Sequence, residues 1–268
     1  MKKSDDRKLI ERTRNSWEKN ASFWDAAMGE GNSFHLKIVA PAVERLLAVK
    51  PGQRVLDLAC GNGHFSKRLC ELGAIVIAAD FSSALIEHAI SRLSSFSGNV
   101  EFRVVDMTNA SELAHLAEMG PFDHIVSNMA LMDIADLEPL ASALPGMLSS
   151  SGDFVFSTAH PCFNAACGTK LGVEEEDRDG VLNTERFIRI VKYATASTSK
   201  SVGIVGQPEP IYQFHRSISE LLRPFFANGF CVDALEEPTH PGPATSTRIF
   251  SWEHYPEIPP VLAVKMRK

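Results

Sequence analysis

A carboxylate and two glycines lie close together in the run Asp57-Leu58-Ala59-Cys60-Gly61-Asn62-Gly63. Gly61 and Gly63 lack a Cβ, so the backbone there can turn sharply and lie against a ligand. A glycine pair alone also occurs in turns that bind nothing. Here the pair follows an apolar run typical of a strand and precedes a helical pattern, and this context favours a nucleotide-binding turn.

Two more carboxylates end apolar runs further along the chain. Asp80 follows 75–79 and precedes Phe81, where an acidic side chain can accept hydrogen bonds from ribose hydroxyls. Capping a helix is the alternative role for Asp80, although Ser82 or Ser83 could fill it. Asp106 ends a third run, where it could accept a hydrogen bond from an exocyclic amine while Met107 packs against a base. Because parallel strands end at one edge of a sheet, we expect these groups to meet one ligand.

The elements that would hold these residues alternate between apolar runs and helical patterns. We expect strands at 55–59, 75–79, 100–105, 122–127 and 154–157, and helices at 34–49, 65–72, 83–93 and 137–148. Strands that are apolar throughout are buried on both faces, which predicts a doubly wound, mostly parallel α/β sheet.

The alternating region and the segments around it divide the chain into four parts, at 1–50, 51–158, 159–212 and 213–268. The first is a helical cap, in which residues 1–30 are polar and helical. The second is the core, and the fourth completes it with a helix at 217–228 and strands at 230–235 and 261–266. The third is a long insertion, which we interpret as a lid over the site; a surface hairpin without a role in catalysis is the alternative.

The composition narrows the class of protein. Hydrophobic residues make up 44% and charged residues 22% of the 268, which is ordinary for a globular protein, and the net charge of −6 disfavours a nucleic-acid partner. We see no secretory signal and no apolar run of membrane-spanning length. The five cysteines lack paired or zinc-finger spacing, so we expect free thiols, no metal and a cytoplasmic location.

Together these motifs resemble the sequence pattern of class I, Rossmann-like S-adenosylmethionine-dependent methyltransferases. The resemblance runs through 55–63, 77–89, 102–107 and 122–133, and continues at Ser151-Gly152-Asp153-Phe154 and Gly229-Phe230. It implies a seven-stranded sheet with a final antiparallel hairpin at one edge. Two residues depart from the family: Ala59 and Ser151 stand where glycine is usual. We expect the methyl of Ala59 to be tolerated, provided that its φ is negative.

The resemblance also assigns cofactor contacts. It implies that Asp57 and the backbone at Ala59, Gly61 and Gly63 hold the methionine part, and that Asp80 beside Phe81 holds the ribose. Asp106 and Met107 would hold the adenine, and the backbone at Asn128 and Met129 would run beneath the sulfonium. We also place Trp24 and His35 near the cofactor.

Shorter matches at Trp24-Asp25, 160–163 and 214–216 resemble methyltransferases that act on small molecules, which suggests specialised metabolism. A neutral histidine could take the acceptor's proton, and His160 and His215 are the candidates. Arg216 could bind an anionic group or make a salt bridge at the start of a helix. Aromatic residues in the covering segments favour an apolar or aromatic acceptor, although core packing would also explain some of them: Trp17, Phe163, Tyr193 and Tyr212.

Two other functions share this kind of sheet. A nicotinamide-dependent oxidoreductase would need a third glycine where Ser66 stands. A non-catalytic sensor or subunit that binds the cofactor would not need aromatic residues in the segments that cover the site. The sequence therefore favours a methyltransferase, which we expect to be a monomer or homodimer.

Overall fold

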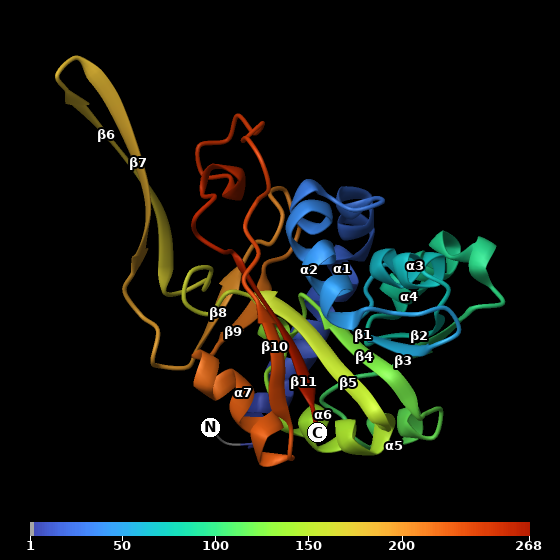
Figure 1. Ribbon diagram of the computed structural model, residues 1–268. Helices are drawn as coiled ribbons and strands as arrows, with labels where there is room; N and C mark the ends of the chain where they lie inside the picture. Colours follow the sequence, from blue (N-terminus) through green and yellow to red (C-terminus); the bar gives the residue numbers. More distant parts are fainter. Residues whose placement is uncertain (1–2) are drawn as a thin grey trace.

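The computed structural model describes residues 3–268, with side chains from Lys8 onward, and is built on one seven-stranded sheet (Figure 1). The strand order is β10-β11-β5-β4-β1-β2-β3. The strands are β1 (Arg54–Leu58), β2 (Ile75–Asp80), β3 (Val100–Val104), β4 (Phe122–Asn128), β5 (Leu148–Ala159), β10 (Cys231–Glu236) and β11 (Val261–Arg267). All neighbours pair in parallel except β11, which is antiparallel to β5 and β10. The predicted fold and its antiparallel edge hairpin are confirmed.

Helices cover both faces of the sheet. On one face, α5 (Ala110–Ala117), α6 (Glu138–Met147) and α7 (Ile218–Ala227) pack on a cluster that includes Leu56, Phe154 and Phe156. On the other, α2 (Ala40–Leu47), α3 (His64–Glu71) and α4 (Ser83–Arg92) pack on Val55 and Val155. Because successive residues of a strand point to opposite faces, this double burial explains why the strands read as continuous apolar runs.

The structure also contains elements that we did not predict. The helix α5 lies between β3 and β4, where Asn109 caps it by accepting hydrogen bonds from the Ser111 and Glu112 amides at 3.1 and 3.4 Å. The strands β8 (Ser197–Ser201) and β9 (Ile211–His215) pair antiparallel in a small separate sheet. At the other end of the chain, the predicted helix at 34–49 is divided into a π-helical turn, His35–Val39, and α2.

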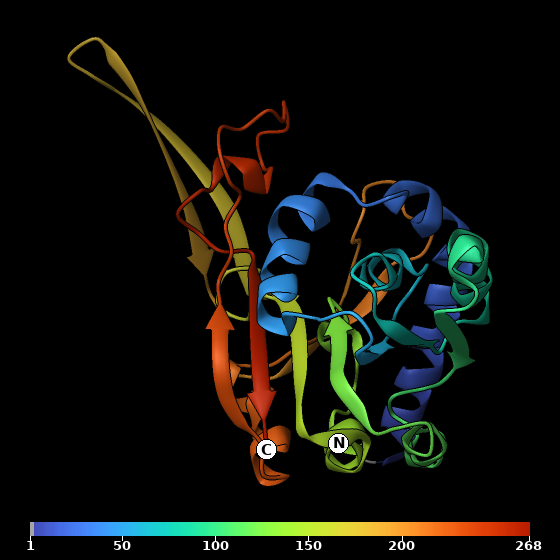
Figure 2. The same cartoon turned by 45° about the vertical axis from the view of Figure 1, so that its right-hand side comes forward.

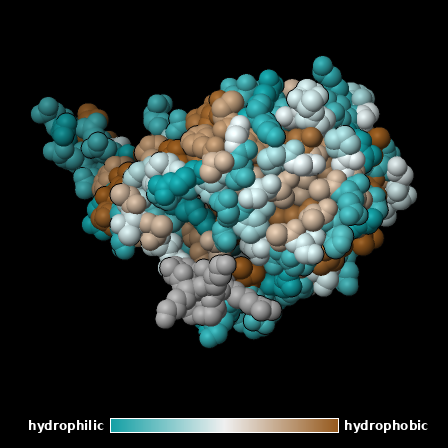
Figure 3. Space-filling model, turned by 90° about the horizontal axis from the view of Figure 1, so that it is seen from below, coloured by the Kyte–Doolittle hydropathy of each residue, from teal (hydrophilic) through white to brown (hydrophobic). Residues whose placement is uncertain are grey.

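The insertion after β5 also contains a long two-stranded ribbon, β6 (Thr169–Arg178) and β7 (Val181–Ile190). The ribbon extends away from the body of the molecule (Figures 1 and 2), and its far end is largely hydrophilic (Figure 3). The end of the insertion packs on the long helix α1 (Lys3–Met28). The Asn20 side chain of α1 donates to the Glu209 carbonyl at 2.8 Å and accepts from its amide at 3.0 Å. Among residues 3–268 no helix is long and apolar enough to cross a bilayer.

Candidate cofactor and acceptor site

A cavity lies where the carboxyl ends of β1, β2, β3 and β4 face α1. It is lined by the loops that follow these strands and by the inner side of the helix. The lining includes most of the predicted cofactor residues: Trp24, His35, Asp57, Ala59, Gly61, Asp80, Phe81, Asp106, Met107, Asn128 and Met129. It also includes Trp17, which we predicted to contact the acceptor. The structure thus brings together residues from five separate parts of the chain.

The glycine loop is shaped by three left-handed residues, with φ of 57° at Ala59, 56° at Gly61 and 75° at Gly63. The expectation of a negative φ at Ala59 is wrong, and its methyl is held in a conformation that favours glycine. A Cβ on Gly61 would meet no atom within 4 Å, whereas one on Gly63 would lie 2.8 Å from the Ala89 Cβ. Gly63 does not line the cavity; its lack of a side chain lets the loop approach α4.

Asp57 is buried at the end of β1 and is 1% exposed. Its Oδ2 accepts a hydrogen bond from the Ser66 hydroxyl at 2.5 Å, while its buried Oδ1 has no partner among the described residues. Burial raises the pKa of Asp57 to about 7. A buried carboxylate oxygen without a partner fits a ligand that brings a donor or a positive charge.

Asp80 connects the ends of β1 and β2. Its Oδ2 accepts from the Gly61 amide and its Oδ1 from the Ser82 amide, both at 2.9 Å. Burial raises its pKa to about 6. Ser82 is the N-cap of α4, because its hydroxyl accepts from the Leu85 amide at 3.2 Å. Asp80 is therefore free of the capping role and faces the cavity.

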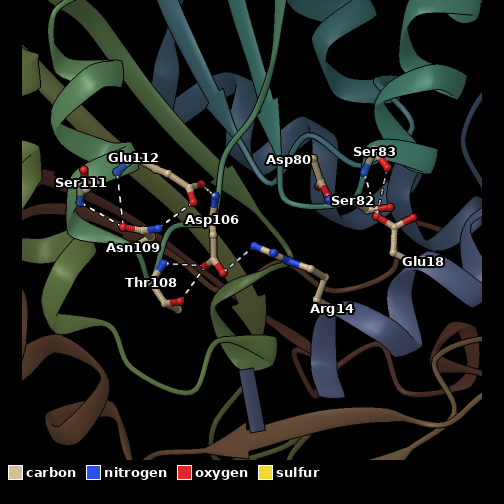
Figure 4. Close-up of polar contacts among 10 residues, drawn as sticks. All are labelled: Arg14, Glu18, Asp80, Ser82, Ser83, Asp106, Thr108, Asn109, Ser111 and Glu112. Carbon is tan, nitrogen blue, oxygen red and sulfur yellow. Dashed lines mark hydrogen bonds and ion pairs between the residues drawn. The ribbon is translucent and has the colours of Figure 1, made fainter. Parts of the chain in front are cut away.

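Asp106 lies two residues beyond β3 and is held on two sides (Figure 4). Its Oδ1 accepts from the Thr108 amide at 2.8 Å and the Thr108 hydroxyl at 2.6 Å. Its Oδ2 accepts from Arg14 Nη2 of α1 at 2.9 Å. The same arginine lies over the Phe81 ring, 5.9 Å from its centroid. An adenine amine bound to this carboxylate would therefore compete with Arg14.

The helix α1 forms the outer wall of the cavity. Trp17 and Trp24 meet edge to face, with ring centroids 4.9 Å apart, and Met28 continues the same side of the helix. Glu18 accepts from the Ser83 amide at 2.8 Å at the start of α4 (Figure 4). Asp25 accepts from the Asn62 side chain at 3.0 Å, which ties the wall to the glycine loop. The wall is thus attached to the loops that follow β1, β2 and β3.

His35 lines the cavity from the π-helical turn. It is 8% exposed, its buried Nε2 has no partner among the described residues, and its ring lies 4.7 Å from that of His64. Burial, and then the neighbouring His64, lower the pKa of His35 to about 4. His35 is therefore neutral at physiological pH and has a nitrogen available to a ligand.

The end of β4 forms the remaining side of the cavity. Met129 has a φ of 54°, and its amide donates to the Ser157 carbonyl and hydroxyl, both at 3.0 Å. The next residues form the short 3-10 helix η3 (Leu131–Asp133). Asp133 lines the cavity and its Oδ1 is buried without a partner among the described residues. We did not predict Asp133, although it lies in the 122–133 segment on which the family resemblance rests.

Four of the predicted residues lie outside this cavity for reasons that their contacts explain. His160 uses both ring nitrogens, because Nε2 is 2.8 Å from Glu237 Oε1 and Nδ1 accepts from the Cys162 amide at 3.1 Å. Phe163 packs on the His160 ring, with centroids 4.5 Å apart. Tyr193 accepts from the Ile218 amide through its hydroxyl at 3.0 Å, and Tyr212 borders a separate surface depression.

His215 and Arg216 also lie outside the cavity, beside a second, smaller pocket. His215 Nε2 is 2.7 Å from the Tyr193 carbonyl oxygen. Arg216 donates to the Ile134 and Ala135 carbonyls, each at 2.7 Å, and to the Leu131 carbonyl at 3.4 Å. Instead of pairing with an anion, the guanidinium holds the loop after β4 from behind.

The sequence matches a family model described as a methyltransferase domain over residues 49–194, which is more than half of the chain. An uncharacterised protein of Haemophilus influenzae is 27% identical over 236 residues, covering 86% of this chain and 87% of that one. A malonyl-[acyl-carrier protein] O-methyltransferase of Magnetococcus marinus is 33% identical over 107 residues, 39% of this chain and 37% of the relative.

Among solved structures, an S-adenosylmethionine-dependent methyltransferase from Mesorhizobium loti has the same fold. Its TM-score is 0.65 at 24% identity, with 85% of this chain and 96% of that chain covered. The chain belongs to the methyltransferase domain family. It is a methyltransferase with the class I, Rossmann-like fold, and solved structures that share this fold include S-adenosylmethionine-dependent methyltransferases.

Proposed function

We propose that the protein methylates a small molecule with an apolar or aromatic body, bound between α1 and the end of β4. The observation that carries this proposal is the wall formed by Trp17, Trp24 and Met28, which faces the ends of the strands. Aromatic side chains supply large apolar contact areas with a defined geometry. A concave cavity of this kind suits a small acceptor better than an extended polymer.

The residues already described divide the cofactor's contacts among them. In this proposal Asp57 and the backbone of the glycine loop hold the methionine part, with His35 beside it. Asp80 and Phe81 hold the ribose, and Asp106 and Met107 hold the adenine. The buried Oδ1 of Asp57 and the open space at Gly61 both fit this arrangement.

When bound, S-adenosylmethionine supplies a methyl group on a positively charged sulfur that leaves as a neutral thioether. The chain's own residues have to align the acceptor and exclude water. Alignment alone can lower the barrier by about 7–11 kcal/mol in favourable cases. The two tryptophans would orient the acceptor, and the contacts of Glu18 and Asp25 with the opposite loops would keep α1 closed over it.

Calorimetric titration with S-adenosylmethionine and S-adenosylhomocysteine tests the cofactor assignment. We expect binding that Asp80→Ala weakens at least about tenfold, because a buried hydrogen bond to a charged group contributes about 1.5–3 kcal/mol. The matched control is Asp233→Ala, which changes an exposed aspartate on β10, and it should bind like the wild type. Equal binding by both variants would refute the assignment of Asp80. A screen of small aromatic acceptors with the wild type then tests the acceptor class.

A further inference from the structure

The Asp133 side chain is partly buried in the wall of the cavity. It lines the cavity at the end of η3, and its Oδ1 is buried without a hydrogen-bond partner among the described residues. Burial raises the pKa of Asp133 well above its usual range. A buried carboxyl oxygen without a partner is costly, and a ligand that donates a hydrogen bond to it would remove that cost.

The position of Asp133 is fixed by the loop that carries it. Arg216 donates to carbonyls on both sides of this residue, at Leu131, Ile134 and Ala135. The Asp133 amide also donates to the Ala130 carbonyl at 2.8 Å. The guanidinium is occupied by these carbonyls from behind the loop, so the carboxyl is left facing the cavity.

The charges around the cavity favour a basic ligand. Its described lining contains four aspartates, Asp57, Asp80, Asp106 and Asp133, and no lysine or arginine. The two histidines in the lining, His35 and His64, both have pKa values lowered by burial. Arg14 approaches from α1 but is paired with Asp106. Of these four aspartates, Asp133 is the one that the proposed function does not assign to the cofactor. A carboxylate or phosphate acceptor beside it would meet repulsion, whereas an amine would be attracted.

We propose that the acceptor is an amine, and that Asp133 binds its nitrogen and takes the proton that methylation releases. This inference rests on the proposed function. The amine lone pair forms the new bond to the methyl carbon as the carbon–sulfur bond breaks, and the sulfur keeps that electron pair. The proton leaves the nitrogen for the Asp133 carboxylate. The products are the methylated amine, the thioether and a neutral carboxyl.

The charge of the methyl donor would change the protonation state that Asp133 favours before and after the reaction. A positive sulfonium in the cavity favours the ionised form of Asp133 before the reaction. Once the sulfur is neutral, that stabilisation is lost, and burial favours the protonated form unless a cationic group such as an ammonium lies beside the carboxyl. The carboxyl thus becomes a stronger base in the step in which the proton must be removed.

Binding to the protein saturated with S-adenosylhomocysteine tests this inference at pH 8. The probes are two amines, 2-phenylethylamine and tryptamine, each compared by calorimetry with the alcohol of the same skeleton. We expect the wild type to bind each amine at least tenfold more tightly than its alcohol, and Asp133→Asn to abolish this preference. The control Asp136→Asn makes the same change at an exposed residue three positions along and should keep the preference.

An equal affinity for amines and alcohols in the wild type would overturn the inference, as would a preference that survives in Asp133→Asn. S-adenosylmethionine affinity is measured on the same variants, and we expect it to be unchanged. If the wild type fails to bind S-adenosylmethionine at all, the proposed function fails instead. A loss of cofactor binding in Asp133→Asn alone would assign the residue to the cofactor and also overturn the inference.

Discussion

Removing Arg14 should tighten cofactor binding while making the protein less stable. Arg14 Nη2 donates to Asp106 Oδ2 at 2.9 Å, with side chains 42% and 10% exposed, respectively. A partly exposed charged pair of this kind contributes about 1 kcal/mol. In Arg14→Met the carboxylate no longer has to exchange an arginine for the adenine amine. The same 1 kcal/mol then appears as a roughly fivefold gain in affinity for S-adenosylmethionine.

Two measurements on one variant check this reasoning. Calorimetry should show the tighter binding, and chemical denaturation of the ligand-free protein should show a free energy of unfolding lower by about 1 kcal/mol. Arg12→Met is the matched control, because Arg12 is exposed on the same helix and does not line the cavity. Unchanged or weaker cofactor binding in Arg14→Met would refute the competition between Arg14 and the adenine.

The other predictions concern the glycine loop and the buried carboxyls. Gly63→Ala should lower the free energy of unfolding by about 3 kcal/mol, because the strain of a left-handed alanine adds to a clash with α4. Gly61→Ala introduces the strain alone and should lower it by about 1 kcal/mol. Denaturant titration compares the two variants, and equal losses would contradict the role of Gly63. The pKa values of Asp57 and Asp80 are raised from 3.8 to about 7 and about 6. Between pH 4 and 7 the folded protein therefore binds more protons than the unfolded chain, so its stability should fall as the pH rises through this range. The cationic cofactor favours the ionised carboxyls, so its affinity should increase as the pH rises. Calorimetry at pH 5.5 and 8 measures this change, and an equal affinity at both pH values would show that the carboxyls do not contact the ligand.

Much of the fold follows from the sequence, because the central strands are buried on both faces and read as unbroken apolar runs. The weaker elements escaped prediction for physical reasons. The helix α5 has only two buried residues, Leu113 and Leu116, which is too few for a clear helical period. The strand β8 is the polar run Ser197–Ser201, and its pairing with β9 is a tertiary contact that local pattern does not encode.

Some residues of the candidate site could also be predicted from the sequence, and others could not. Residues at the carboxyl ends of strands, such as Asp57 and Asp80, could be placed because these ends share one edge of the sheet. His160 also follows a strand, but its ring is taken up by Glu237, which lies 77 residues further along the chain. Arg216 likewise donates hydrogen bonds to carbonyls of residues 131–135, which are more than 80 residues away in the sequence. Sequence spacing indicates which end of a strand a side chain occupies, but its neighbours from other segments determine what it contacts.

The wall made by α1 has a consequence for how the chain folds. This helix precedes the strands in the chain, yet some of its contacts are with residues as distant as Asp106 and Glu209. Closing such long loops costs entropy that is recovered only when the later segments are in place. We therefore expect the sheet to form before α1 docks, so that the cavity is completed late in folding.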